Sequence, residues 1–268
     1  MKWIDSFLFN GEPIVQLRLA YLFPHVDTVY ICEQRYTHQG QRKETLYIDT
    51  YKEWFAPYIS KIRFLIDESE PLTNAWKSEN GHRNFAATAI AEDYPTDPFL
   101  LICADVDEIP NIDFLLQEQD KIYAHASKGP VYLQQKMYYY NLHWFVHPWD
   151  HPFIINDILF RTGNTLQSYR DKNYQNATFI PCGWHFSYFM EREDILRKIE
   201  SFAHTEYNSE DYKSAEYIDK CLMFGLDLYH RTWMPSFTRE DPEEQGYPPI
   251  FLEFHTALLS RQHASNQA

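Results

Sequence analysis

The sequence lacks any hydrophobic run long enough to cross a bilayer, and Asp5 stands where a secretory signal peptide needs an apolar core. Cysteine is also scarce. The four cysteines, Cys32, Cys103, Cys182 and Cys221, lie far apart and include no C-x-x-C pair. Cys32 and Cys103 fall inside apolar runs, so we expect buried free thiols in a reducing compartment. These features predict a soluble, cytoplasmic protein without an integral membrane segment.

Positive charge is in short supply. The chain has 24 Lys and Arg residues against 38 Asp and Glu, which gives a formal net charge of −14. This excess of negative charge argues against binding to nucleic acid or to an anionic membrane surface. The chain also has no G-x-G-x-x-G and no P-loop, which argues against an ordinary dinucleotide-binding or NTP-hydrolysing enzyme. Any bound phosphate must therefore be held by a few well-placed cations or by a metal ion.

What the chain does contain is an alternation of strand and helix patterns over its first 110 residues. Short apolar runs predict strands at 4–9, 26–32, 62–66 and 99–104, with helices between them at 13–21, 51–58 and 78–94. Such alternation is typical of a parallel α/β sheet. Later strands are expected at 131–141, 153–160 and 179–189, later helices from 191 and at 214–224, and a closing segment at 248–259.

The most informative stretch is the apolar strand at 99–104, because three carboxylates follow it at once: Asp105, Asp107 and Glu108. Ligands of open α/β sheets bind at the carboxyl ends of strands. Two carboxylates that close repel each other unless a cation lies between them, and oxygen ligands suit Mg²⁺ or Mn²⁺. The pattern therefore indicates a metal-assisted site for a phosphate-bearing substrate. The alternative is that the acids cap a following helix, which Asn111 could open.

Two cations are candidates for holding a phosphate. Lys43 lies in the polar loop at 34–43 that follows the second strand, and an ordinary solvated loop is the alternative there. Arg83 is expected in the first turn of the helix at 78–94, where a cation opposes the helix dipole. Such a local conflict tends to mark function, although a surface arginine is a fair alternative.

Three histidines at a spacing of four, His143, His147 and His151, suggest a zinc site. Pro148 and Pro152 break any helix that would align the three rings, so a sugar-binding or acceptor surface is the preferred interpretation. Aromatic residues make up 17% of the chain, and Tyr and Trp offer a flat apolar face with a polar handle. A tyrosine-rich core explains the same number equally well.

Several motifs, taken together and in order, resemble glycosyltransferase family 17. They are residues 7–18 (FLFNGEPIVQLR), the strand 29–33 with the glycine loop 36–40, residues 104–110 (ADVDEIP), 183–188 (GWHFSY) and 251–258 (FLEFHTAL). The resemblance spans nearly the whole chain. It implies a GT-A-like, Rossmann-like fold with a mostly parallel central sheet flanked by helices. It also implies a single domain over 1–260, with a nucleotide-sugar half (1–110), an acceptor half (111–260) and a flexible tail (261–268).

The resemblance further implies a divalent metal, Mn²⁺ or Mg²⁺, and a UDP-sugar donor. Animal members of the family use UDP-GlcNAc, and the sugar is transferred with inversion. Asp105 and Asp107 match the family's Asp-x-Asp: Asp107 would ligate the metal, and Asp105 would hold the ribose or the waters of the metal. His185 would be a third metal ligand or an acceptor contact.

The resemblance also gives roles to the remaining candidate site residues. Arg83 and Lys43 would contact the phosphates, and Glu33 would lie near the nucleoside. An inverting transfer needs a base for the acceptor hydroxyl, and Glu193 matches a family glutamate. Capping of the helix that Glu193 opens explains this residue at least as simply.

Compared with the animal enzymes, we expect this protein to lack the membrane anchor and stem, which leaves the acceptor open. We expect a microbial or viral origin and an acceptor such as a surface polysaccharide or a lipid-linked glycan. Two alternatives remain at this stage. A haloacid-dehalogenase-type phosphatase also places Asp-x-Asp after an apolar strand, usually the first strand. A non-catalytic carbohydrate-binding protein would need no nucleotide and would tolerate loss of Asp107.

Overall fold

The computed structural model describes residues 1–37, 40–70, 75–172, 174–201 and 205–265. The described strands form one mixed sheet in the order β10-β7-β6-β8-β4-β1-β2-β3, with β9 paired to β6 and to β5. The strands are β1 (Lys2–Leu8), β2 (Thr28–Gln34), β3 (Ile62–Asp67), β4 (Phe99–Cys103), β5 (Glu108–Ile109), β6 (Val131–Tyr139), β7 (Trp144–Trp149), β8 (Phe153–Asn156), β9 (Thr178–Ser187) and β10 (Thr238–Arg239).

The first half of the sheet is parallel, as the strand and helix alternation predicts. β1 lies between β2 and β4, β3 pairs with β2, and all of these pairings are parallel. The carboxyl ends of these four strands therefore meet along one edge. That edge is where an α/β sheet places its ligand.

The second half is largely antiparallel, so the sheet is mixed rather than mostly parallel. β8 runs antiparallel to β4 and β6, and β7 runs antiparallel to β6. The short connection from β6 to β7 forces that direction, because a few residues can join only antiparallel neighbours. The strand expected at 153–160 ends at Asn156, whose side chain accepts a hydrogen bond from the Leu159 N–H and caps a short helix instead.

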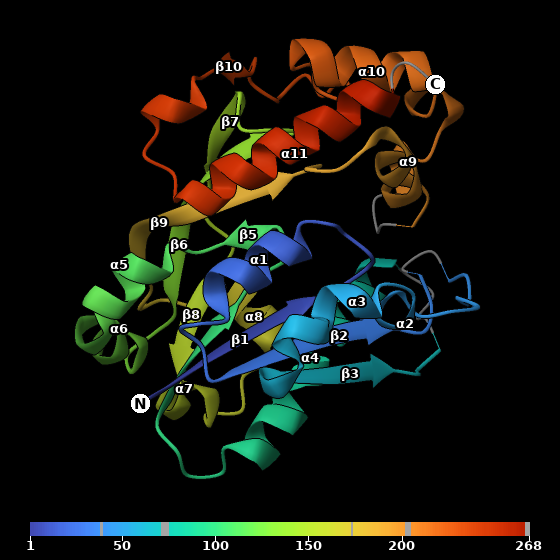
Figure 1. Ribbon diagram of the computed structural model, residues 1–268. Coiled ribbons are helices and arrows are strands. Elements are labelled where there is room, and N and C mark those ends of the chain that lie inside the picture. Colours follow the sequence, from blue (N-terminus) through green and yellow to red (C-terminus); the bar gives the residue numbers. More distant parts are fainter. Residues whose placement is uncertain (38–39, 71–74, 173, 202–204, 266–268) are drawn as a thin grey trace.

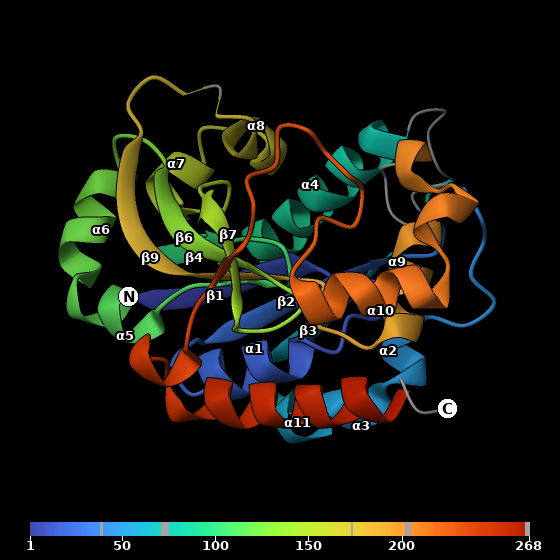
Figure 2. The same cartoon turned by 90° about the horizontal axis from the view of Figure 1, so that it is seen from above.

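Helices cover both faces of the sheet (Figures 1 and 2). α1 and α11 lie on one face, and α4, α7 and α8 on the other, while α9 and α10 lie beyond the end of β9. The α-helices are α1 (Val15–Leu22), α2 (Tyr47–Thr50), α3 (Lys52–Phe55), α4 (Ala75–Asp93), α5 (Ile112–Gln117), α6 (Gln119–Ala126), α7 (Asp157–Phe160), α8 (Leu166–Arg170), α9 (Arg192–Ser201), α10 (Ala215–Phe224) and α11 (Pro249–Ser265). Short 3-10 helices occupy Ala56–Lys61, Thr205–Tyr207, Glu210–Tyr212 and Pro242–Glu244.

Strand β4 is buried on both faces, as its uninterrupted apolar sequence predicts. Leu100 and Ile102 pack into the core on the side of α1, and Phe99 and Leu101 pack into a second core on the side of α4. Because side chains alternate along a strand, one continuous apolar run fills both layers. Because β4 is packed on both faces, it fixes the position of the acids that follow it relative to the sheet.

Two of the helices whose bounds differ from expectation change how nearby residues are interpreted. α4 begins at Ala75, so Arg83 lies in the interior of the helix and the expected conflict with the helix dipole does not arise. α11 continues to Ser265, so residues 261–265 of the expected tail are helical, and 266–268 lie outside the described residues. The buried Gln262 side chain donates hydrogen bonds to the carbonyls of Tyr140 and Met190, which fastens the end of this helix to β6 and β9.

Two further expectations concern helices and thiols. Among the described residues, no helix combines the length and the apolar composition that crossing a membrane requires. All four cysteines are free and buried, as predicted for Cys32 and Cys103. Burial raises the pKa of the Cys32 thiol to about 12, so this thiol stays protonated and inert near neutral pH.

Candidate active site

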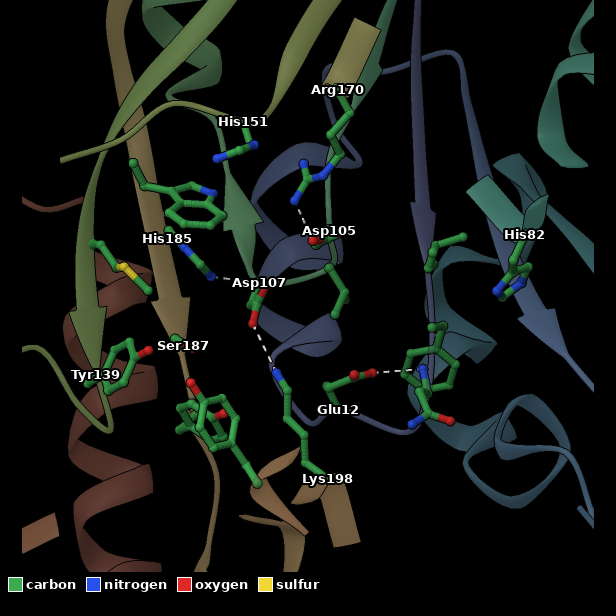
Figure 3. A pocket seen from close by; sticks show the side chains of 18 of the residues that line it. Glu12, His82, Asp105, Asp107, Tyr139, His151, Arg170, His185, Ser187 and Lys198 are labelled. Atoms are coloured by element: carbon green, nitrogen blue, oxygen red, sulfur yellow. Dashed lines mark hydrogen bonds and ion pairs between the residues drawn. The ribbon is translucent and has the colours of Figure 1, made fainter. Parts of the chain in front are cut away.

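A cavity of about 780 Å³ opens at the carboxyl edge of the parallel strands. Its walls come from both halves of the sheet: the loops after β1, β2 and β4 on one side, and β6, β7 and β9 on the other. Figure 3 shows Asp107 between Glu12 and His82 on one side and Tyr139 and Ser187 on the other. The acidic motif thus lies at the middle of the cavity.

The turn from Asp105 to Glu108 is held from behind by Arg18 of α1. The Arg18 guanidinium donates to the carbonyls of Asp105 at 3.0 Å and Glu108 at 2.8 Å. It also forms a bidentate pair with Asp5 of β1, at 2.9 and 2.6 Å. Both side chains are almost completely buried, so this pair fixes the turn relative to the sheet.

Asp105 is held by two arginines. Arg83 of α4 reaches one carboxylate oxygen at 2.7 Å, and Arg170 of α8 reaches the other at 2.6 Å. Arg170 also bridges to the fully buried Glu108 at 2.8 Å. Burial alone would raise the pKa of Asp105, but the Arg170 and Arg83 guanidiniums hold that pKa well below its usual range. Asp105 is therefore ionised and fixed in orientation.

Asp107 faces the cavity with looser partners (Figure 3). The antiparallel pairing of β5 with β9 sets Glu108 opposite His185, which brings the His185 ring to the acidic motif. His185 Nε2 lies 3.5 Å from one Asp107 oxygen, and Lys198 Nζ of α9 lies 3.3 Å from the other. Burial opposes ionisation, but Lys198 and His185 outweigh it and lower the pKa of Asp107.

These residues can be tested against the metal site that the motif predicts. Two ligand atoms about 2.1 Å from one octahedral ion lie about 3 Å apart, so Asp107 and His185, at 3.5 Å, need only a small approach to share an ion. Asp105 fits less well as a direct ligand, because both of its oxygens already accept bonds from arginines. Within the described residues, no group of three or more His, Cys, Asp or Glu side chains is arranged to hold an ion. A metal here would therefore take most of its ligands from substrate and water.

A further carboxylate, Glu12, lies in the cavity wall just after β1. It accepts a hydrogen bond from the Asn10 N–H at 2.8 Å. Burial raises the pKa of Glu12, and the nearby Lys198 ammonium only partly offsets this. A partly buried carboxyl that has a raised pKa and lines a cleft is a candidate general base.

The two residues predicted near the nucleotide are paired with each other. Lys43 Nζ lies 3.0 Å from Glu33, and Lys43 also lines the cavity. The carboxylate of Glu33 accepts the backbone N–H groups of Tyr47 and Ile48 at 2.8 and 2.9 Å, which caps the start of α2. Lys43 can therefore reach a ligand, while Glu33 positions Lys43 and α2 from behind the wall.

Other predicted residues are placed away from the cavity or apart from one another. Glu193 opens α9 as expected, but its side chain is 62% exposed and pairs with Arg192, and it is not among the described residues that line the cavity. Of the three histidines, His147 and His151 line the cavity, whereas His143 lies in a separate pocket beside His255. The three rings do not converge, so the zinc interpretation is wrong.

Sequence reasoning missed four residues of this site: Arg18, Glu12, Arg170 and Lys198. One signal was available, because Asp5 interrupts an apolar strand and Arg18 interrupts an apolar helix next to it. Opposite charges on two adjoining buried elements predict an ion pair. Nothing local marks Arg170 or Lys198, which reach the motif from α8 and α9 through the tertiary fold.

Comparison with known proteins gives one strong match. The family model described as Glycosyltransferase family 17 matches residues 1–238, which is most of the chain. No curated protein matches the chain. Two of the solved structures that match show how weak the similarity is. A mannose-6-phosphate isomerase from Helicobacter pylori has a TM-score of 0.35 and 11% identity, with 60% of this chain and 72% of that chain covered. A mannose-1-phosphate geranyltransferase from Thermus thermophilus has a TM-score of 0.31 and 13% identity, with 89% of this chain and 69% of that chain covered.

Proposed function

The chain belongs to glycosyltransferase family 17 and is a glycosyltransferase, and we propose that it moves GlcNAc from UDP-GlcNAc to a glycan hydroxyl with inversion. The observation that carries this proposal is the Asp105–Asp107 motif at the end of β4. It lies at the middle of a large cavity, with Asp105 locked and Asp107 presented to the ligand. A cavity of this size falls in the range of sites that hold small ligands and cofactors.

Three cations can neutralise the diphosphate of the donor as it leaves. Lys43, Arg170 and Lys198 line the cavity, and they come from three different elements. Fixed cations that face a developing negative charge lower the barrier because they need no rearrangement during the reaction. Lys198 is especially suited, since Asp107 and Glu12 raise the pKa of its ammonium despite burial.

We assign the predicted metal, Mn²⁺ or Mg²⁺, to Asp107 and His185. When bound, the ion would supply Lewis-acid stabilisation of the leaving diphosphate. Asp105 then orients the turn and hydrogen-bonds the ribose or the waters around the ion. This division follows from the partners of each carboxylate: Asp105 has two short ion pairs, and Asp107 has two long ones.

For the general base we propose Glu12 instead of Glu193. Glu12 lies in the cavity wall and has a raised pKa, while Glu193 is largely exposed and paired with its neighbour. A base must come within hydrogen-bond reach of the proton that it removes. Glu12 lines the same cavity as Lys198 and Asp107, so we propose that an acceptor hydroxyl bound there comes within its reach.

The arrangement disfavours the phosphatase alternative. That chemistry uses the first aspartate of the motif as a nucleophile, and both oxygens of Asp105 are held by guanidinium groups. The motif also follows the fourth strand of the chain rather than the first.

The direct test is thermal stabilisation of the purified protein by UDP and UDP-GlcNAc, with and without Mn²⁺. A ligand that binds only the native state raises the melting temperature by mass action. We expect a rise that needs both nucleotide and metal, and its loss in Asp107→Ala. Asp120→Ala, an exposed acid on α6, is the matched control and should keep the shift. The absence of any shift with UDP-sugars in the wild type would contradict the proposal.

A further inference from the structure

We infer that Trp233 is a stacking platform for a pyranose ring of the acceptor glycan. This inference rests on the proposed function and adds the acceptor side of the same cavity. Trp233 is 67% exposed, the largest exposed fraction among the large apolar side chains of the described residues. It nevertheless lines the cavity. An indole with an open face at the wall of a cleft presents a flat apolar surface, which suits the C–H face of a sugar ring.

Hydrogen bonds and buried side chains hold the segment that leads to Trp233. Asp227 accepts hydrogen bonds from the backbone N–H of Arg231 at 2.6 Å and from its Nε at 3.0 Å. Leu228 and Tyr229 are buried and anchor the segment to the core around β6 and β9. Trp233 also has only two side-chain torsions, so little conformational freedom is lost when it binds. A platform fixed in advance binds more tightly than one that must be ordered by its ligand.

Arg231 supports the indole from one side. Its guanidinium carbon lies 5.1 Å from the centre of the Trp233 ring and 5.2 Å from the centre of the Tyr229 ring. Arg231 also donates a hydrogen bond to the Tyr139 hydroxyl at 3.0 Å. Its charge is balanced by Asp227, so we assign it a bracing role rather than a phosphate-binding one. One face of the indole is covered by Arg231, and the exposed area is left for a ligand.

A continuous series of contacts joins this platform to the reaction centre. Arg231 touches Tyr139 and Tyr229, Tyr229 shares a hydrogen bond of 2.8 Å with Tyr188, and Lys198 lies 5.1 Å from the centre of the Tyr188 ring. Lys198 in turn pairs with Asp107. Figure 3 shows Tyr139 and Ser187 across Asp107 from Glu12 and His82. Tyr139, Tyr188 and Tyr229 therefore form an aromatic wall of the same cavity as the acidic motif. This wall lies on the side away from the loop after β1.

The test uses the full chain with UDP and Mg²⁺ present, and the methyl glycosides of GlcNAc, glucose, galactose and mannose as probes. Binding is measured by saturation-transfer difference NMR on wild type, Trp233→Ala, Trp233→Phe and Phe224→Ala. We expect at least one glycoside to bind the wild type, at least about tenfold weaker binding in Trp233→Ala, and partial recovery in Trp233→Phe. Phe224, which is 58% exposed and is not among the described residues that line the cavity, is the matched control and should leave binding unchanged.

Two results would contradict the proposed role of Trp233. One is equal glycoside binding in wild type and Trp233→Ala, and the other is no glycoside binding by a wild type that still binds UDP. The shift in melting temperature with UDP and Mg²⁺ is recorded for every variant, and we expect Trp233→Ala to keep it. If UDP does not raise the melting temperature of the wild type, the transferase proposal is contradicted. If UDP raises it but glycoside binding does not depend on Trp233, only the proposed role of Trp233 is contradicted.

Discussion

The parallel and antiparallel halves of the sheet build their sides of the cavity differently. Beside β1 to β4, charged side chains are locked by buried partners, as Arg18 is by Asp5 and Arg170 is by Glu108. Beside β6 to β10, the wall is aromatic, and rings such as Tyr139, Tyr188 and Tyr229 pack edge to face around one braced arginine.

This difference suits the two substrates of a transferase. A diphosphate leaving group needs charges that are already oriented, and buried ion pairs hold them in place. A sugar acceptor presents hydroxyls around an apolar ring face, and aromatic side chains can match it without a net charge. We therefore expect substitutions in the first half to change chemistry or stability sharply, and those in the second half to act on acceptor binding or on pH dependence.

The largest effect should come from Glu12→Gln, which removes the proposed base while keeping its shape. Turnover should fall by about 10²- to 10⁴-fold, with donor affinity nearly unchanged. Glu193→Gln is the matched control, because Glu193 is 62% exposed and paired with Arg192, and it should retain wild-type turnover. Steady-state kinetics with UDP-GlcNAc and the nucleotide melting shift measure the two quantities. A loss of donor affinity in place of turnover would move Glu12 to a nucleotide-binding role.

The next largest effect concerns the brace behind the motif. Arg18→Met leaves Asp5 buried without its partner and frees the carbonyls of the Asp105–Glu108 turn. Breaking a buried pair in this way costs about 3–5 kcal/mol of unfolding free energy. Urea denaturation of the variant measures it.

Lys2→Met is the control for that experiment, since the Lys2–Asp27 pair is partly exposed to solvent and its loss should leave stability near the wild-type value. Equal stability of the Arg18→Met variant and the wild type would mean that the buried pair does not secure the turn.

The smallest effect tests the antiparallel half through His255 of α11. Burial and the neighbouring His143 lower the pKa of His255 to about 4. The unfolded chain, with an ordinary histidine pKa of about 6.5, therefore gains a proton between pH 7 and pH 5 that the folded chain does not. The contribution of His255 to the free energy of unfolding is therefore fully present above pH 6.5 and is lost as the pH falls toward 4. The loss is on the order of 2 kcal/mol by pH 5.

His255→Phe should remove that part of the loss, and His25→Phe, a substitution of an exposed histidine, should keep it. Urea denaturation at pH 7 and pH 5 gives the comparison. An unchanged pH dependence in His255→Phe would show that His255 is not the titrating group.

Several parts of the fold could be predicted because they depend on local pattern. The apolar run of β4, the Asn111 cap of α5, and the Ser214 cap and Gly225 end of α10 all follow from residue type and spacing. The antiparallel second half was harder, since strand direction there is set by short connections and by pairing between distant segments. The prediction of a strand at 153–160 was wrong beyond Asn156. The Asn156 side chain caps a short helix there, although apolar residues follow it.

The position of the acidic motif follows from local sequence, because the carboxyl end of a buried parallel strand lies at an edge of the sheet. The tertiary structure alone decided which partners the two aspartates have. His185 reaches Asp107 through the register of β5 on β9, and Arg170 and Lys198 arrive from α8 and α9. Those contacts join segments far apart in sequence, and they form only when the whole core packs.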